Sequence, residues 1–259
     1  MRGEWVVDGT STRATAGSPA TVGERRRARS TLSRERVLAT ALRLVDADGV
    51  DSLSMRRLGK ALGCDPMQLY RYAPSKDALL DGVVELVLSR LDVPPAADGD
   101  WAQVLRRTGH AFRELALAHP NVVPLLVTRP LATPLALRPL GTLRPLEKLL
   151  DLFITAGFGE REALHAYRLY MGFLHGHVLN ELQERVLAPD ETDDLLRLGL
   201  QRLPLREFPR IRALAGELAT YDGARELDEG LTGVLAGLRT GDSRSRTGPE
   251  SGRACGEHR

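Results

Sequence analysis

Hydrogen-bonding, aromatic and cationic side chains are concentrated in one short stretch of this chain. The stretch carries an amide, two phenol rings and two cations, in the order Gln68, Tyr70, Arg71, Tyr72 and Lys76. An amide can pair with the edges of DNA bases, whereas phenol hydroxyl groups and cations can bind phosphates. The chemistry that this set supports is therefore recognition of double-stranded DNA.

The elements that must position these side chains are two short helices joined by a tight turn. The Ser54 hydroxyl can cap the first helix, which Gly63 can end by adopting a positive φ. Asp65 can cap the second helix, and Pro66 suits its first position because that position needs no N–H group. Four apolar residues at helical spacing give the first helix a face to bury: Met55, Leu58, Ala61 and Leu62.

Two such helices are typical of a helix-turn-helix, whose second helix enters the major groove of DNA. The same pattern also occurs as a corner between two helices inside an all-helical protein. The local pattern leaves both interpretations open, so the longer sequence around it has to decide.

The run from residue 32 to residue 80 resembles the N-terminal DNA-binding domain of the TetR family of repressors. The resemblance implies that this chain is a DNA-binding transcriptional regulator. The residues that carry it match the family pattern in order and spacing: Leu32, Ser33, Ala41, Leu44, Gly49, Leu53, Ser54, Arg57, Leu58, Ala61, Leu62, Gly63, Leu69, Tyr70, Lys76, Leu79 and Leu80.

This resemblance also implies roles for individual side chains. Arg56 would contact a base edge, and Gln68 would pair with adenine. Met67 and Gln68 replace the smaller residues that are usual in the family, so the operator sequence does not transfer from relatives. The predicted DNA-binding set adds phosphate contacts and comprises Ser54, Arg56, Pro66, Met67, Gln68, Tyr70, Arg71, Tyr72 and Lys76.

Composition bounds the class of protein. The 259 residues are enough for one large or two small domains, and the formal charge of +2 leaves room for a basic face balanced by an acidic one. Alternation of β-branched and aromatic residues is scarce, which predicts an all-α protein. Lysine occurs only at Lys60, Lys76 and Lys148, and the dominance of arginine is typical of GC-rich genomes such as those of actinobacteria.

The cysteines and the apolar runs indicate the compartment. Cys64 lies in the helix-turn-helix and Cys255 in a polar tail, so a disulfide between them is not expected and a reducing, cytoplasmic setting is predicted. The sequence contains no apolar run long enough for a membrane span and no signal peptide pattern. We expect no membrane partner.

Changes in composition divide the chain into parts. Residues 1–31 are predicted to be a disordered, arginine-rich extension, whose basic run either binds DNA or forms a solvated tail. Residues 32–91 would form the DNA-binding domain with a connecting helix, 101–240 a second domain and 241–259 a polar tail. Periodicity predicts helices over 33–48, 76–91, 101–119, 143–156, 160–186, 208–221 and 224–239, and only short helices in the proline-rich part between 121 and 142.

Residues 101–240 resemble, more loosely, the C-terminal domain of tetracycline repressors. The resemblance implies a ligand pocket between the helices that begin near residues 101, 143 and 160. It also implies a homodimer formed by the 160–186 helix and the last helix. A two-fold dimer would place two recognition helices on a palindromic operator.

The pocket expected from this resemblance is largely apolar. Leu125 and Asn180 stand where tetracycline repressors carry a His and a Glu that serve the magnesium of the drug complex, and neither suits a hard cation. Magnesium–tetracycline is therefore not the expected inducer, and an aromatic or polyketide-like compound is. Each predicted pocket residue has plain core packing as its alternative, and the set is Thr108, Phe112, Leu125, Thr128, Leu149, Leu164, Tyr167, Met171 and Asn180.

The sequence thus predicts a ligand-released, homodimeric repressor that needs no cofactor. His165, His175 and His177 do not form a metal site in this interpretation, because no carboxylate or thiol completes the set and neighbouring helical positions point apart. An enzyme is not expected, since glycine-rich phosphate loops, G-x-S-x-G and H-E-x-x-H motifs are absent from the sequence. The alternatives left open are an activator and a DNA-binding protein without a ligand.

Overall fold

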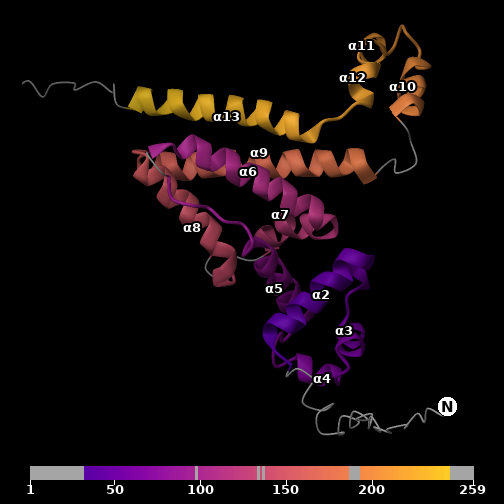
Figure 1. Cartoon of the computed structure of the whole chain (residues 1–259), viewed down its shortest axis with the longest axis vertical. Helices are drawn as coiled ribbons and strands as arrows, with labels where there is room; N and C mark the ends of the chain where they lie inside the picture. Colours follow the sequence, from indigo (N-terminus) through magenta and orange to yellow (C-terminus); the bar gives the residue numbers. More distant parts are fainter. Residues whose placement is uncertain (1–31, 97–98, 133–134, 136–137, 187–192, 246–259) are drawn as a thin grey trace, which may run out of the picture. The chain divides into compact units, whose positions relative to one another are not determined.

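The computed structural model describes residues 32–96, 99–132, 135, 138–186 and 193–245 (Figure 1). All regular secondary structure in this part of the chain is helical, which confirms the predicted all-α class. No helix within it is long and apolar enough to cross a membrane. The predicted N-terminal extension, its basic run, the end of the polar tail and Cys255 lie outside the described residues.

The first helices form a compact bundle around fully buried aliphatic side chains. Leu58 and Leu69 have no exposed surface, so the two short helices both anchor in this core. A Cβ atom added to Gly82 would lie 2.6 Å from a methyl carbon of Leu38, which shows how closely the fourth helix of the bundle approaches the first. The elements are α2 (Arg34–Asp48), η1 (Val50–Ser52), α3 (Met55–Leu62), α4 (Pro66–Leu69) and α5 (Lys76–Leu88).

Helix α9 contacts α6, α7, α8 and α13, whereas α10, α11 and α12 contact one another. Figure 1 shows α13 running alongside α9 and α6. The elements are α6 (Trp101–Ala118), η3 (Pro120–Val122), α7 (Val123–Ala132), α8 (Leu140–Thr155), α9 (Glu160–Val186), α10 (Asp193–Gln201), α11 (Pro209–Ala213), α12 (Ala215–Ala219) and α13 (Gly223–Ser245).

Helix boundaries differ from the prediction in several places. Helix α5, predicted over 76–91, ends at Leu88. The helix predicted to begin at Leu143 begins at Leu140, so Pro145 lies inside it and not in its first turn. A proline there leaves the Gly141 carbonyl group without its helical donor. Gly141 itself is buried against Glu85 of α5, where any side chain would collide.

The C-terminal helices also differ from the prediction. The helix expected over 208–221 is two short helices, because the backbone at Leu214 departs from helical geometry (φ −96°, ψ 10°). Helix α13 continues past Gly241 to Ser245, into the segment expected to be a tail. Glycine lowers helix propensity without forbidding a helix, so Gly241 was not a sufficient stop signal.

Candidate DNA-binding surface and ligand pocket

The turn between α3 and α4 is built by the capping residues that the sequence indicated. The Ser54 hydroxyl accepts a hydrogen bond from the Arg57 amide at 3.2 Å, and Gly63 ends α3 in the left-handed region with φ 68°. The Asp65 carboxylate accepts from the Met67 amide at 2.8 Å. These caps fix the direction of α4 relative to α3.

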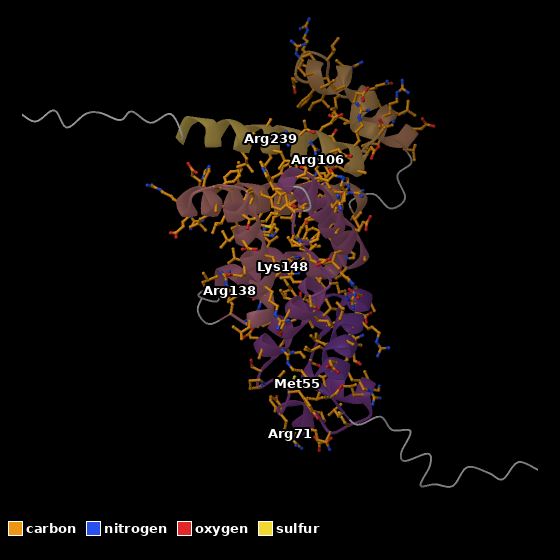
Figure 2. The ribbon with its side chains drawn as sticks, turned by 60° about the vertical axis from the view of Figure 1, so that its left-hand side comes forward. Met55, Arg71, Arg106, Arg138, Lys148 and Arg239 are labelled. Atoms are coloured by element: carbon orange, nitrogen blue, oxygen red, sulfur yellow. The ribbon has the colours of Figure 1, made fainter. Side chains whose placement is uncertain are left out.

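Helix α4 buries one side chain completely and exposes Met67 and Gln68. Leu69 is fully buried, whereas Met67 is 70% exposed and Tyr70 is 45% exposed. Most of the predicted DNA-binding residues are exposed: Ser54, Arg56, Met67, Gln68, Tyr70, Arg71 and Lys76 are exposed, and Pro66 and Tyr72 are half-buried. In Figure 2, Arg71 lies at the end of the bundle that points away from α13. This surface offers an amide, phenols and cations to a partner.

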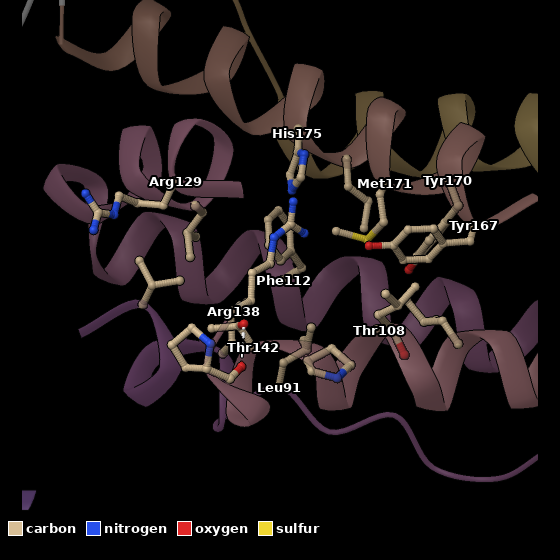
Figure 3. A pocket seen from close by; sticks show the side chains of 18 of the residues that line it. Leu91, Thr108, Phe112, Arg129, Arg138, Thr142, Tyr167, Tyr170, Met171 and His175 are labelled. Carbon is tan, nitrogen blue, oxygen red and sulfur yellow. Dashed lines mark hydrogen bonds between the residues drawn. The ribbon is translucent and has the colours of Figure 1, made fainter. Parts of the chain in front are cut away.

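A cavity of about 960 Å³, including the part open to solvent, lies between α5, α6, α7, α8 and α9. It brings together five of the predicted ligand-binding residues: Thr108, Phe112, Leu149, Tyr167 and Met171 (Figure 3). Aliphatic side chains fill most of the remaining wall, among them Val84, Leu88, Leu126 and Leu174. A cavity with a mainly apolar wall and a few polar groups is typical of a site for a small organic ligand.

Four predicted ligand-binding residues lie outside this cavity. Leu125 is buried, but the next residue of α7, Leu126, is the one that faces the cavity. The Thr128 hydroxyl donates to the Pro124 carbonyl oxygen at 2.8 Å. Leu164 is exposed one turn before Tyr167, and Asn180 lines a separate groove between α9 and α13.

The cavity wall also contains polar residues that sequence reasoning missed. Arg138 lies in the proline-rich connection before α8, where no periodicity indicates a direction. His175 stacks near Phe112 with ring centroids 5.7 Å apart, and burial lowers the pKa of its imidazole, so the ring is neutral near pH 7. Burial raises the pKa of the Tyr167 phenol, and the nearby positive charge of Arg138 opposes that rise.

Two hydroxyl groups on the cavity wall differ in their hydrogen bonding. The Tyr170 hydroxyl donates to the Leu105 carbonyl oxygen at 2.8 Å, and burial raises the pKa of its phenol. The Thr108 hydroxyl is buried and has no hydrogen-bond partner among the described residues. A ligand that reaches Thr108 could therefore supply a missing partner.

Replacement of Thr108 by valine is expected to raise the melting temperature of the ligand-free protein. Valine keeps the shape of the side chain and removes an unsatisfied buried group, a change worth about 1 kcal/mol, or about 2–4 °C in a chain of this size. The matched control is Thr142→Val, since that hydroxyl lines the same cavity but donates to the Pro139 carbonyl oxygen at 2.7 Å. A melting temperature below that of the parent protein for Thr108→Val would contradict this account.

The cavity borders the bundle of helices α2 to α5 at a cluster of ion pairs formed by Arg129, Asp77 and Asp81. The Arg129 guanidinium donates through Nε to Asp81 Oδ1 at 2.8 Å, through Nη1 to Asp77 Oδ1 at 2.8 Å and through Nη2 to the Asp77 carbonyl oxygen at 2.8 Å. Arg129 and Asp81 line the cavity, and Asp77 follows Lys76 at the start of α5. Arg129 and Asp81 thus belong both to the cavity wall and to the contacts that hold α5.

A second polar contact joins the end of α6 to the end of α2. His119 Nδ1 lies 3.0 Å from the Asp46 carboxylate, and the Asn121 amide donates to the carbonyl oxygens of Val45 and Asp46 at 3.1 and 3.0 Å. These bonds cap the C-terminus of α2. The DNA-binding bundle is thus held at two places by the helices that surround the cavity.

Comparison with known proteins gives two matches to family models. The model described as bacterial regulatory proteins, tetR family, matches residues 37–83. The model described as tetracyclin repressor-like, C-terminal domain, matches residues 93–241, which is more than half of the chain. The first match covers α4, and the second covers the cavity-lining residues of α6 to α9.

Individual relatives agree with these matches. The tetracycline repressor protein class D of Escherichia coli is 34% identical over 223 residues, which cover 80% of this chain and 92% of that protein. The HTH-type transcriptional repressor DrrR1 of Streptomyces coeruleorubidus is 32% identical over 160 residues, and this match spans 56% of that longer protein. The structure of the Streptomyces coelicolor protein ActR in complex with actinorhodin superposes with a TM-score of 0.68 at 29% identity, covering 82% of this chain and 98% of that one.

Proposed function

We infer the role of the cavity from one premise, that this chain belongs to the TetR family of DNA-binding transcriptional repressors. We propose that it is a homodimeric repressor that a largely apolar small molecule releases from a palindromic operator. The observation that carries this proposal is the position of the cavity, whose wall includes the Arg129–Asp81 pair that holds α5. We place its action on DNA in the cytoplasm.

Release would act through α5. A ligand that moves Arg129 or Asp81 alters the contacts that hold α5. Helix α5 begins at Lys76 and is the next helix after α4. The ligand shifts the protein toward a conformation in which the two α4 helices of a dimer are wrongly spaced for the operator. The loss of DNA-binding free energy can be no larger than the difference in ligand-binding free energy between the two conformations.

Two features support a homodimer through α9, α13 and the segment between them. A Cβ atom added to Gly172, Gly176 or Gly233 would meet no described atom within 4 Å, so these helix faces are open to close approach by another helix. Large apolar side chains are exposed on the outer side of α10–α12 and the turns beside them: Leu195, Leu198, Leu205, Phe208, Ile211, Leu214 and Leu218. Exposed apolar surface of this kind marks an interface.

The chemistry of the wall supports an aromatic effector. Phe112, Tyr167, Tyr170 and His175 offer ring surfaces to a flat molecule. The relative ActR has been crystallised with actinorhodin, which is consistent with such an effector here.

The proposal is tested by gel-shift binding to the DNA beside the gene of this protein, with and without a panel of aromatic antibiotics and polyketides. We expect a sequence-specific complex that one class of compound dissolves, and a dimer mass by light scattering. A specific complex that no compound dissolves would favour the alternative of a DNA-binding protein without a ligand. A monomeric DNA-binding species would contradict the dimer.

Replacement of Lys76 by alanine is expected to weaken binding to all DNA sequences equally. Lys76 is exposed at the start of α5 and is assigned to bind a phosphate, an interaction that carries no sequence information. In a dimer, the slope of log affinity against log salt concentration should fall by about 2, because each phosphate that is no longer neutralised removes about 1 from the slope. Filter binding over a range of salt concentrations measures this slope, and a changed base preference would argue against the assignment.

A further inference from the structure

Three segments of the chain meet at the side chain of His119, the residue that ends α6. Its Nδ1 atom lies 3.1 and 3.0 Å from the two carboxylate oxygens of Asp46, in the last turn of α2. Its Nε2 atom lies 2.8 Å from Nη1 of Arg90, just beyond the end of α5. These three residues form the His119 joint, which connects the C-terminal ends of α2, α5 and α6.

The chemistry of the two partners determines which nitrogen of the ring carries the proton. A guanidinium group can only donate hydrogen bonds, so Nε2 of His119 accepts from Arg90. Nδ1 then carries the ring proton and donates to the Asp46 carboxylate. The side chain of His119 is 13% exposed, so water competes little for these bonds. Each nitrogen atom of the ring therefore holds a different helix in a defined direction.

The joint holds the bundle of helices α2 to α5 at a different place from Arg129. Arg129 holds the start of α5 through Asp77 and Asp81, whereas the joint holds the far end of α5 together with the end of α2. Packed helices can slide by small amounts, whereas hydrogen bonds with a fixed donor and acceptor resist rotation. A body held at two places keeps its orientation, and one held at a single place can rotate about it.

A small rotation of the bundle is large on the scale of DNA. Helix α5 has 13 residues and is about 20 Å long, so rotation by about 5° displaces one of its ends by about 2 Å. One base pair changes the separation of two half-sites by about 3.4 Å and rotates one of them by about 35°. Loss of the joint would therefore move a recognition helix by a large part of one base-pair step.

We propose that the His119 joint sets the half-site spacing of the operator. His119 is the positioning residue: it touches no DNA and acts by fixing the orientation of the bundle that carries α4. This inference rests on the proposed function, because spacing has a meaning only for a dimer on a palindromic operator. It places a determinant of DNA recognition outside the helix-turn-helix.

The test uses the full-length protein and three DNA duplexes. The first is the operator that the parent protein selects from random-sequence DNA, and the other two have one base pair inserted or removed at its centre. Fluorescence anisotropy gives the affinity for each duplex. The parent protein should prefer its own spacing by about tenfold. His119→Ala should reduce this preference by about threefold, because the bundle is no longer confined to one orientation.

Further variants identify the bond that acts. Arg90→Ala removes only the bond to Nε2, so it should reduce the preference less than His119→Ala, and the double variant should equal His119→Ala because both changes affect one joint. Arg90→Lys should retain part of the preference, since a cationic donor remains. The matched control is His110→Ala. His110 lies on the same helix and pairs with Asp228 of α13 at 2.8 Å, outside the bundle, so its loss should leave the spacing preference unchanged.

Each outcome decides the proposal. If His119 only stabilised the fold, His119→Ala would lower the affinity for all three duplexes by the same factor, and this result would overturn the proposal. An unchanged preference in His119→Ala, or an equal loss in His110→Ala, would also overturn it. Arg90 is exposed, so Arg90→Ala carries the test if His119→Ala does not fold.

Failure of the repressor proposal would look different. A parent protein that selects no sequence, or that binds all three duplexes equally, would overturn the palindromic dimer and this inference with it. A parent protein with a clear spacing preference that His119→Ala shares would overturn this inference alone.

Discussion

Replacement of Gln68 by alanine should weaken binding to the intact operator by about 2–6 kcal/mol, because a bidentate amide–adenine pair is worth about 1–3 kcal/mol and a dimer would lose one pair in each half-site. Gln68 is exposed on α4, so its truncation leaves the core of the bundle unchanged. Competition binding against operators substituted at each position measures the effect. Discrimination should disappear at one base pair in each half-site and persist at the others.

The control for Gln68→Ala is Gln103→Ala. Gln103 is an exposed glutamine of α6, and only its backbone amide takes part in the cap formed by Asp100. DNA affinity should be unchanged in this variant. An unaltered sequence preference in Gln68→Ala would remove Gln68 from the set of base-contacting residues, although it would leave α4 as the recognition helix.

Replacement of Arg113 by methionine should lower the free energy of unfolding by about 3–5 kcal/mol, because it leaves a buried carboxylate without its counter-charge. Glu181 of α9 is 1% exposed and accepts from Arg113 of α6 through both oxygens, at 2.6 and 2.7 Å. His177 Nε2 lies 3.6 Å from the same carboxylate, but burial lowers the pKa of that imidazole in the parent protein, where Arg113 is the charged partner. Urea denaturation measures the decrease in stability.

Two further variants test whether the loss of stability comes from an unpaired buried charge. The double variant Arg113→Met with Glu181→Leu should recover most of the stability, because replacing both partners by apolar groups can be nearly neutral. Arg225→Met removes an ion pair with Glu229 whose side chains are 74% and 62% exposed, and it should change the stability little. Equal urea midpoints for Arg113→Met and Arg225→Met would refute this account.

Local rules predicted the part of the fold that depends on local chemistry. The Ser54 and Asp65 caps, the positive φ of Gly63 and both ends of α9 follow from neighbouring residues, and the structure has them where the sequence placed them. A cap needs only a side-chain oxygen and an amide two or three residues away. No knowledge of the packing is required for these assignments.

The cavity depended on packing and was predicted only in part. Whether Leu125 or Leu126 faces the cavity depends on the rotation of α7, which begins within a proline-containing turn. Arg138 enters the wall from an irregular segment, so no helical period could reveal it.

The shallow anchoring of α4 has a consequence for engineering and for divergence between paralogues. With Leu69 alone buried, the exposed positions of α4 can be exchanged without disturbing the cavity. New operator sequences can therefore be assigned to an unchanged chemical sensor, as a biosensor circuit requires. Changing the cavity while keeping the DNA-binding helices is more constrained, because the cavity residues Asp81 and Arg129 also hold α5. A cavity with a new ligand preference therefore has to be selected for DNA release at the same time.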